Sequence, residues 1–428
     1  MIDTNNIRFA GDISIEQINI VTSKGMTQNI TNQVIAIDIF EDLFSPFMTG
    51  VIGVKESFDF TNLLPFIGEE FVNITLYTPS LDKKHHIDQQ FYIYKISNRI
   101  LGGDRSTYYE LHFISKEAIV DANKKVSKVY EGLVSDIAKD LFTNPEYGLE
   151  STKQINVERT SNNNKFIANY WSPVRSLNFI AGQAVSVDGE ANYLFYENRR
   201  GLNFMSLGSL YKQEPYMEFV YDNYARDIDS RGQTSINLTE DYKRITDIEV
   251  PVLTNYIEKA TSGMFASKII SNDVLTKRYY SKNYFMTEDY ANTSHLNKFS
   301  PTTSRVVNHP NSMVINAPRE YDPFNGYHDT SNVRTVQRRI SQIASSQSSK
   351  INITVLGRTD YTVGMKVYVT LFKVEPIKKD EALEETIDKV LSGYYIVSAI
   401  NHSINRNKHE CVMELIKDSY IMDLNEGK

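Results

Sequence analysis

The first quarter of the chain alternates apolar and polar residues in short runs, which Gly, Pro, Asn and Asp interrupt. From about residue 7 to 115 these runs are QVIAIDIFED, GVIGVKES, EFVNITLYTP, QFYIYKISNRI and YYELHFIS. Alternation with a period of two puts the apolar side chains on one face of a strand, and the interrupting residues favour turns. The pattern predicts a first β domain over residues 1–115.

The period changes between residues 116 and 142, where apolar residues recur three and four positions apart. This spacing predicts one face of a helix, and hence a domain boundary near residue 115. The residues that follow it are Val126, Val129, Leu133, Ile137 and Leu141.

A second helix and a hairpin follow, which together predict an α+β middle domain over residues 116–222. In SPVRSLNFIAGQAV, Ser172 can cap the free backbone amides and Pro173 suits the first helical position. The next segment, NYLFYENRRGLNFMSL, has the pattern of a hairpin.

Strand patterns resume over residues 223–286 and 340–428, and an irregular segment separates these two ranges. Residues 287–332 contain four of the twelve prolines together with many Asn, Ser, Thr and His residues, which is too irregular for a sheet. A helix is predicted at VRTVQRRISQIA. We therefore predict a loop-rich insertion with a helix, 287–339, inside a second β domain.

The two β regions look like copies of one unit. Laying FYIYKISN (91–98) over YIVSAINH (395–402) matches Phe91 with Tyr395, and Glu110 and Glu414 each follow 19 residues later. Similarity of short strands by chance is the alternative to duplication, and we favour duplication.

Composition narrows the function classes. A chain of 428 residues with 41% hydrophobic residues is long enough for several folded domains. The single cysteine, Cys411, excludes an internal disulfide, and a net charge of −7 argues against a dedicated nucleic-acid binder. No apolar run reaches the length of a membrane span and the N-terminus lacks a signal-peptide pattern, so we expect cytoplasmic synthesis without membrane insertion.

The C-terminal segment GYYIVSAINHSINRNKHECVMELIKDS gathers His402, His409 and Cys411, which are residue types that bind zinc or build a nucleophile with its base. In the aligned copies His402 corresponds to Asn98, and Cys411 can serve as a small apolar residue. We therefore predict no metal, cofactor or catalytic site here. Replacing these residues by Asn, Gln and Ser should remove no bound metal.

Two groups of arginines are candidates for a functional role, two at a turn and three on a helix. Arg199 and Arg200 stand at a hairpin tip, and Arg334, Arg338 and Arg339 fall on one side of the predicted helix, where they could meet an acidic partner. Solvated side chains are the favoured interpretation for both groups.

One apolar loop, DLFSPFMTG (42–50), carries Leu43, Phe44, Phe47 and Met48 around a proline. Loops lie at the surface, so an apolar loop indicates a covered patch. Either the loop folds over its own domain or a partner chain covers it. These four residues are the predicted partner interface, and Phe47→Asp should weaken assembly without unfolding the chain.

An ordered set of segments resembles the central baseplate hub proteins of contractile-tailed bacteriophages and the N-terminal part of VgrG spike proteins. The resemblance covers nearly the whole chain. The segments are FSPFMTGVIGVKESFDFTNLLPFIGEEFVNITLYTP, WSPVRSLNFIAGQA, YLFYENRRGLNFMSL, SGMFASKIISNDVLTKRYY, VLGRTDYTVGMKVYVTLF and the C-terminal segment quoted above.

The resemblance implies a mainly β fold with α+β insertions, in which two similar tube-type β-barrels flank the middle domain. It also implies a homotrimer whose six barrels form a ring between the hexameric tail tube protein and the trimeric central spike protein, beside other baseplate proteins. DNA would pass through the ring without specific binding. Such a protein is structural, not an enzyme, and is located in the virion after assembly in the host cytoplasm.

The chain ends soon after the second β domain, at about Leu424, so we expect the spike and any lysozyme to be separate chains. Two alternatives remain. One is a tail-associated hydrolase of cell wall or polysaccharide, with Glu190 and Glu197 as acid and base. The other is a receptor-binding tail protein, which should bind cells by itself.

Overall fold

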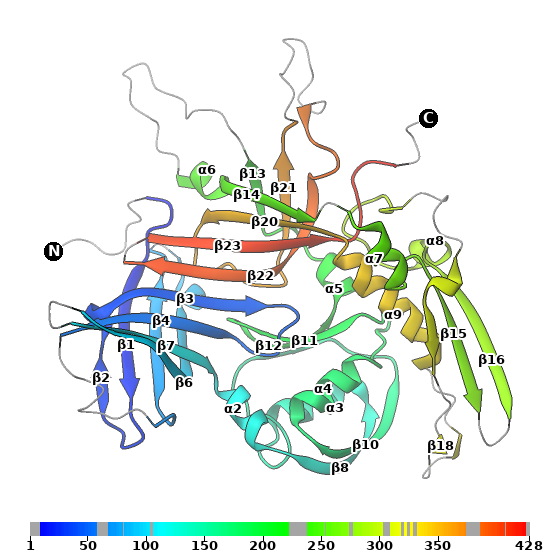
Figure 1. The fold of residues 1–428 in the computed structure, drawn as a ribbon, viewed down its shortest axis with the longest axis horizontal. Helices are drawn as coiled ribbons and strands as arrows, with labels where there is room; N and C mark the ends of the chain where they lie inside the picture. Colours follow the sequence, from blue (N-terminus) through cyan, green and yellow to red (C-terminus); the bar gives the residue numbers. More distant parts are fainter. Residues whose placement is uncertain are drawn as a thin grey trace.

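The computed structural model describes residues 9–57, 67–79, 81–102, 106–221, 238–252, 254–273, 277–302, 309–317, 321–322, 326–327, 332–373, 386–406 and 408–424. Its largest element is a sheet of 13 strands that runs across the molecule (Figure 1). All its pairs are antiparallel except β13 with β21. The predicted mainly β fold is confirmed. None of the described helices has the length and apolar character needed to cross a membrane.

The N-terminal half of this sheet has the strand order β3–β4–β7–β6–β5–β1–β2. Its strands alternate buried and exposed positions as the sequence predicts, most regularly in β4, and their inner faces share one apolar core. The strands are β1 (Ser14–Val21), β2 (Thr27–Asn29), β3 (Val34–Asp42), β4 (Thr49–Glu56), β5 (Phe71–Tyr77), β6 (Ile87–Leu101) and β7 (Thr107–Ser115).

The C-terminal half has the order β14–β20–β23–β22, with β21 paired to β22 and β13 paired to β21. A second apolar core lies against these strands. The strands are β13 (Met217–Tyr221), β14 (Ile245–Val252), β20 (Ser349–Leu356), β21 (Lys366–Leu371), β22 (Gly393–Asn405) and β23 (Lys408–Lys417), with the short helix α6 (Leu238–Lys243) before β14.

The middle segment corrects one sequence prediction, the single helix over 116–142. Residues Val126–Leu133 form strand β8, which pairs antiparallel with β10 (Asn163–Trp171). β-branched Val126 and Val129 suit a strand, and Gly132 has φ 138°, outside the helical region. Helices therefore form only on either side, as α2 (Lys116–Asn123) and α3 (Val134–Thr143).

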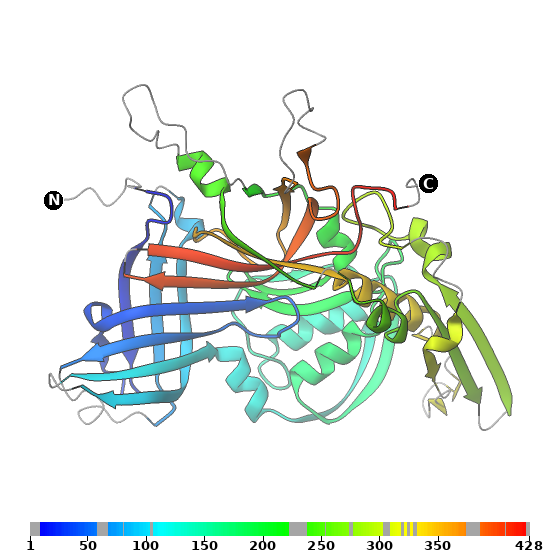
Figure 2. The same cartoon turned by 45° about the horizontal axis from the view of Figure 1, so that its top comes forward.

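The other middle-segment predictions are confirmed. Helix α4 (Pro173–Ala181) begins with Ser172 Oγ accepting a hydrogen bond from the Arg175 amide at 3.3 Å. The predicted hairpin is β11 (Tyr193–Asn198) with β12 (Gly201–Ser206), and β12 also pairs with β9 (Ile155–Val157), while α5 (Leu207–Tyr211) follows. Figures 1 and 2 show α3 and α4 beneath the large sheet, and their buried residues share a third core with β11 and β12.

The predicted insertion, residues 287–339, lies to one side of the sheet, at the right of Figure 1, and its predicted helix is α9. Its strand β17 pairs with β15, which also pairs with β16. The sequence prediction assigns β15 and β16 to the second β domain, but in the structure they belong to this separate sheet and not to the large one. The elements are α7 (Tyr256–Thr261), β15 (Ala266–Asp273), β16 (Arg278–Phe285), α8 (Met286–Asp289), β17 (Val314–Asn316), β18 (Tyr321–Asp322), β19 (Gly326–Tyr327) and α9 (Asn332–Ser346).

Candidate functional site

The two halves of the large sheet meet where β22 pairs with β3. The pairing runs antiparallel from Ala399 opposite Asp42 to Asn405 opposite Ala36. Asn401 reinforces it by donating from Nδ2 to the Asp38 carboxylate at 3.1 Å. The strands lie side by side in Figures 1 and 2. β22 is longer than its partner β21, which pairs only with residues 393–396. On that side, residues 399–405 of β22 pair instead with β3, a strand of the other half of the sheet.

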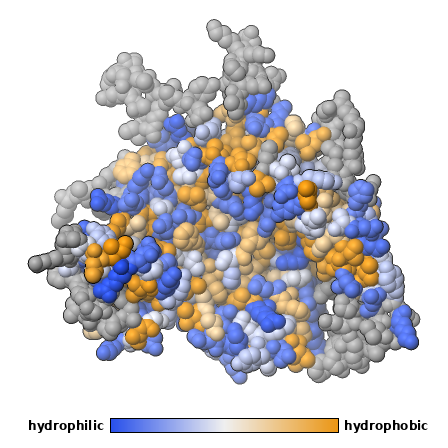
Figure 3. All heavy atoms as spheres, viewed as in Figure 1, coloured by the Kyte–Doolittle hydropathy of each residue, from blue (hydrophilic) through white to orange (hydrophobic). Residues whose placement is uncertain are grey.

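Other strand edges of the large sheet also lack a partner strand among the described residues, including those of β2, β13, β14 and the end of β6. The end of β6, from Lys95 to Leu101, pairs only with β7, and β14 pairs only with β20. Both edges expose apolar side chains: Leu101 is 79% exposed and Val252 is 44% exposed. Figure 3 shows apolar surface at the left-hand edge, where strands of the N-terminal half end in Figure 1. Open edges of this kind are sites for strand addition.

The apolar loop predicted as a partner interface is covered largely by its own chain. Leu43 and Met48 are buried, and the Phe47 ring packs edge-on against Phe195 of β11, with centroids 6.2 Å apart. Phe44 alone of the four predicted residues remains exposed, at 38%. Leu43, Phe47 and Met48 therefore pack against their own chain, which is one of the two predicted arrangements. Contact with a partner chain stays a prediction for Phe44.

A buried ion cluster fixes this loop to the middle segment. Lys153 bridges the carboxylates of Glu117 and Glu197, and Glu197 also accepts a hydrogen bond from the Met48 amide at 3.0 Å. Burial raises the pKa of Glu197, against the opposing charge of Lys153. The loop is thus held by a polar contact as well as by its apolar side chains.

The C-terminal cluster brings together all three residues weighed in the sequence. His402 Nδ1 lies 3.1 Å from His409 Nε2, and Cys411 Sγ lies 3.4 Å from each of these nitrogens. All three side chains are buried. Burial and the charge of Arg199 lower the pKa of His402 to about 3, and burial raises the pKa of the Cys411 thiol. Both imidazoles are therefore neutral.

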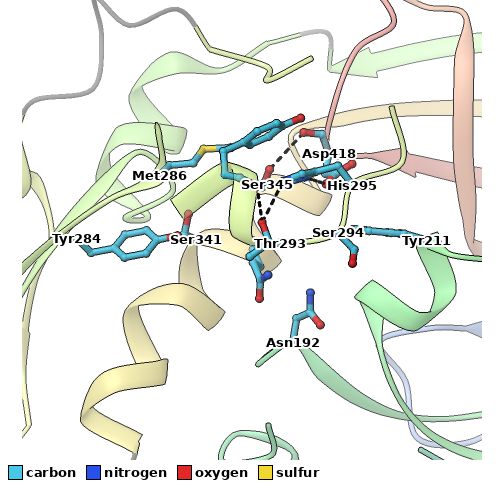
Figure 4. Close-up of a pocket in the computed structure, with 12 residues that line it drawn as sticks. Asn192, Tyr211, Tyr284, Met286, Thr293, Ser294, His295, Ser341, Ser345 and Asp418 are labelled. Carbon is cyan, nitrogen blue, oxygen red and sulfur yellow. Dashed lines mark hydrogen bonds and ion pairs between the residues drawn. The ribbon is translucent and has the colours of Figure 1, made fainter. Parts of the chain in front are cut away.

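A pocket beside the insertion holds the arrangement closest to a catalytic triad (Figure 4). His295 Nδ1 lies 2.6 Å from Asp418 Oδ2, and His295 Nε2 lies 3.0 Å from Thr293 Oγ1. The pocket wall also includes Tyr290, whose ring stacks on His295 with centroids 3.6 Å apart.

The contacts of His295 do not suit a general base. Its Nε2 lies 2.8 Å from the Tyr290 carbonyl, an acceptor that requires a proton on this nitrogen. Burial lowers the pKa of His295, but the hydrogen bond and charge of Asp418 outweigh this effect, and the pKa is raised. The proton on Nε2 prevents this nitrogen from taking the proton of Thr293. We call this arrangement of His295, Asp418 and Tyr290 the clasp, because it ties the insertion to the end of β23.

The two carboxylates of the hydrolase alternative are both engaged in structural contacts. Glu190 accepts hydrogen bonds from the Ser294 amide and the Gln342 side chain, each at 2.8 Å. Glu197 belongs to the Lys153 cluster described above, and both side chains are buried. Neither carboxylate lines the pocket. This arrangement offers no acid and base on opposite sides of one glycosidic bond.

The arginine predictions need correction for Arg199, Arg338 and Arg339, whose side chains make contacts within the chain, whereas Arg200 is exposed. Arg199 is half-buried and donates to the carbonyls of His85 and Asp360, so it joins the two halves of the sheet. Arg338 forms a two-point ion pair with Asp289. The side chain of Arg334 lies outside the described residues. Backbone carbonyls and a carboxylate of the same chain thus replace both solvent and the acidic partner.

Arg339 is corrected in the same way. It donates to the carbonyls of Ala191 and Tyr193 at 3.0 and 2.9 Å. Burial lowers the pKa of Arg339 to about 10, so the side chain stays charged at neutral pH. Helix α9 is therefore anchored on the loop before β11.

No protein-family model matches the chain. The chain is 20% identical over 421 residues to the probable baseplate hub protein gp334 of Vibrio phage KVP40, with 92% of each chain covered. This chain resembles phage baseplate hub proteins. The resemblance predicted from the sequence is confirmed.

Two solved structures share its fold. The tail protein from Neisseria meningitidis MC58 has a TM-score of 0.55 and 12% identity, covering 94% of this chain and 96% of that one. The 43 kDa tail protein of prophage MuSo2 from Shewanella oneidensis has a TM-score of 0.54 and 10% identity, covering 94% and 98%.

For a hub-like protein the strand edges are the candidate functional surface, and the sequence did not single them out. Alternation predicts that β6 and β14 are strands, but not which strand pairs with which. One signal was available: Ile100 and Leu101 extend the apolar run of β6 beyond the length of its partner β5.

Proposed function

We propose that this chain is one of three identical subunits of a baseplate hub ring in a contractile phage tail. Each subunit contributes two similar β-barrel units, so that the ring has six. The ring joins the hexameric tail tube protein to the trimeric central spike protein, contacts neighbouring baseplate proteins and leaves a channel for DNA. The similarity to phage hub and tail proteins supports this proposal, and the strand pairing carries it.

The observation that carries it is a match between two sets of five strands. The first set is β3–β4–β7–β6–β5 and the second is β14–β20–β23–β22–β21, each in the order of hydrogen-bonded neighbours and each antiparallel throughout. Two units with one strand order are what an internal duplication produces.

A register shift occurs at the same place in both sets. On β6 it lies between Ile93 and Lys95, and on β22 between Val397 and Ala399. The alignment of segment 91–98 with segment 395–402 matches Ile93 with Val397 and Lys95 with Ala399, so the two shifts fall at aligned positions. Bulges depend on local strand geometry, so their coincidence is a stronger sign of duplication than shared apolar residues.

A second pair of shifts agrees. It lies between Val34 and Ala36 on β3 and between Ile245 and Asp247 on β14. In each set the shift directly follows the first position that pairs with the neighbouring strand, β4 or β20. A further shift, between Glu249 and Val252, is present on β14 and not on β3. The copies differ outside the five strands, because β1 joins β5 antiparallel whereas β13 joins β21 parallel.

One residue match from the sequence alignment requires correction. Ile93 pairs with Phe113, whereas Val397 pairs with Leu415, so the first hairpin is two residues longer. The extra length lies beyond a further shift between Ser97 and Ile100. As a result His112, and not Glu110, occupies the place of Glu414.

The junction within the chain indicates how subunits would meet. By the same equivalences, the half of β22 that binds β3 corresponds to the exposed end of β6, residues 95–101. The bound part of β3 corresponds to the exposed edge of β14. We propose that β6 of one subunit pairs with β14 of the next as β22 pairs with β3. Such a head-to-tail contact forms a closed ring when the rotation that relates one unit to the next is a whole-number fraction of 360°.

Charge favours this pairing. The end of β6 carries Lys95 and Arg99, and β14 carries Asp247 and Glu249. Past the shift between Ser97 and Ile100, the register transferred from the junction places Ile100 opposite Glu249, and Arg99 directly precedes Ile100 in the shifted stretch, next to Glu249. Opposite charges across antiparallel strands stabilise a pair by about 0.2–1 kcal/mol and disfavour other registers.

Charge reversal tests the proposed contact. Arg99→Glu alone should shift the purified chain, or its complex with the spike, from trimer towards monomer in sedimentation velocity. Arg99→Glu combined with Glu249→Arg should restore the trimer, because the pair is re-formed with its signs exchanged. Lys55→Glu, on a strand of the same unit away from this edge, is the control. A trimer unaffected by Arg99→Glu, or a double variant as impaired as the single one, would contradict this contact.

The channel itself has an expected character. DNA must slide through it, and many phosphate contacts would hold DNA tightly, so we expect a polar wall that is not strongly basic. The net charge of −7 is compatible with such a wall. A cell-wall lysis assay on the purified chain distinguishes the proposed hub from the hydrolase alternative. We expect the native chain to show no more lysis than the Glu190→Gln variant.

A further inference from the structure

The buried cluster of His402, His409 and Cys411 lies next to the junction of the two sheet halves. His402 belongs to β22 and stands opposite Ile39 of β3 on one side and Cys411 of β23 on the other. The three potential ligand atoms lie within 4.8 Å of one another, and among the described residues no other group of this kind occurs. From this geometry we infer a buried site with three protein ligands for a zinc-type divalent cation.

The distances between the ligand atoms fit a tetrahedral ion. Zinc–nitrogen distances of about 2.0–2.1 Å and a zinc–sulfur distance of about 2.3 Å separate two nitrogens by about 3.3 Å and nitrogen from sulfur by about 3.6 Å. The observed separations are 3.1 Å for the nitrogens of His402 and His409, and 3.4 Å from each to Cys411 Sγ. Each observed edge is therefore shorter by only about 0.2 Å, within the tolerance of such sites.

Hydrogen bonding alone explains this arrangement poorly. The two nitrogens and the sulfur make three mutual contacts, and each would need its own hydrogen to be a hydrogen bond. A hydrogen on His402 Nδ1 can serve one contact well and the thiol hydrogen can serve a second, so one contact is left without a hydrogen bond. The far nitrogens, His402 Nε2 and His409 Nδ1, are buried and make no hydrogen bond by strict geometry. A cation binds all three inner lone pairs at once and assigns the ring protons to the far nitrogens.

A carboxylate lies on the far side of the His402 ring. Glu41 Oε1 is 3.9 Å from His402 Nε2, beyond hydrogen-bonding distance, while Glu41 Oε2 is held by the Thr362 hydroxyl and by the Val363 amide at 3.1 Å. A carboxylate that accepts the proton of a histidine ligand orients the ring and strengthens the ligand, and Glu41 would take this role on closer approach to Nε2. Three protein ligands leave the fourth position to water.

The ring of His409 occupies space that only a glycine permits. A Cβ atom on Gly357 would come within 2.3 Å of this ring. The backbone also fixes the strand there, since the His409 amide donates to the Gly11 carbonyl and its carbonyl accepts from the Gly357 amide. The ion would thus lock the hairpin of β22 and β23 where it meets β3.

The test measures metal on the untagged full-length chain, purified without chelators. We expect about one zinc ion per chain by elemental analysis, as binding of an ion to one formed site requires. After exchange with Co²⁺, thiolate-to-cobalt charge transfer and intense tetrahedral bands should be visible. Cys411→Ser should lose the charge-transfer band, and the triple change to Asn, Gln and Ser should lose the metal, the opposite of the sequence-based expectation. His309→Gln, at an exposed histidine, is the matched control and should keep both.

Two results would overturn the site. One is a folded native chain that retains no stoichiometric zinc and gives no thiolate band with Co²⁺. The other is a Cys411→Ser variant that keeps the band of the native chain. If the variants do not fold, the native Co²⁺ spectrum and its loss on adding EDTA decide the question. Neither result depends on hub assembly, so the proposed function is tested separately.

Discussion

Single side chains fasten the segments of this chain to one another, and the clasp residue His295 shows how such a contact depends on pH. Its pKa is raised by Asp418, so the folded chain binds the proton more tightly than the unfolded chain does. The stabilisation is fully present below the unfolded pKa of about 6.5 and is lost as the pH rises through the higher folded pKa.

His295→Gln should therefore lower the free energy of unfolding by about 1.5–3 kcal/mol at acidic pH, the range for hydrogen bonds to a charged group. The loss should shrink as the pH rises above the folded pKa. Urea unfolding of native and variant chains at several pH values measures it, with His309→Gln, at an exposed histidine, as the control. A loss of equal size at all these pH values would mean that the charge of His295 contributes nothing.

Two glycines of the strand sets provide a matched test of packing. A Cβ on Gly357 would meet the His409 ring at 2.3 Å, whereas a Cβ on Gly53 of β4 would lie 3.9 Å from the Ala36 backbone. Gly357→Ala should cost about 1–3 kcal/mol or more, because extra volume in a packed core forces rearrangement. Gly53→Ala should be tolerated.

Thermal melting of the two alanine variants compares them directly. Equal melting temperatures for Gly357→Ala and the native chain would show that the His409 ring moves freely, which would also weaken the case for a built metal site.

Among the elements, the loop between β3 and β4 separates packing within the chain from packing against a partner. Phe47 packs on Phe195, so Phe47→Asp should destabilise the folded chain itself by several kcal/mol, because it buries a charge without a partner. This replaces the expectation that Phe47→Asp leaves the chain folded. Phe44 is 38% exposed, so Phe44→Asp should leave folding intact.

Circular dichroism melts and sedimentation of the two aspartate variants distinguish these roles. A trimer lost in Phe44→Asp with an unchanged melt would assign Phe44 to a subunit or partner interface. A folded, stable Phe47→Asp variant would contradict the packing described for the loop.

The sequence predicted elements well where local chemistry decides them. Alternation located most strands of both sets, and Ser172 with Pro173 located the start of α4. It failed over Val126–Leu133, where spacing fitted a helix but pairing with β10 decides the conformation. Contacts between distant segments override a short periodic pattern.

The candidate sites were predicted less completely, for the same reason. The sequence identified His402, His409 and Cys411 as neighbours, but the convergence of their ligand atoms depends on the register of β22 and β23. Glu41, on β3, could not be linked to them without the junction. The free edges of β6 and β14 likewise follow only from knowing which strands have partners.

At the scale of the whole molecule, the proposed position between tube and spike explains why the chain would contain two similar strand sets. A ring that faces a sixfold tube on one side and a threefold spike on the other needs two equivalent surfaces from each of three subunits. The set that contains β3 and the set that contains β14 share strand order and two register shifts, and the chain already makes one of the unit-to-unit junctions. The remaining junctions would lie between subunits.

The most direct measurement is an electron cryomicroscopy reconstruction of the hub within the assembled tail at a resolution that separates strands. Our account predicts three copies of this chain in a ring of six similar barrels, with residues 95–101 of each copy antiparallel to β14 of the next and the middle segment outside the channel. A ring with another number of copies, or one in which β6 and β14 end in solvent or bind unrelated surfaces, would contradict it.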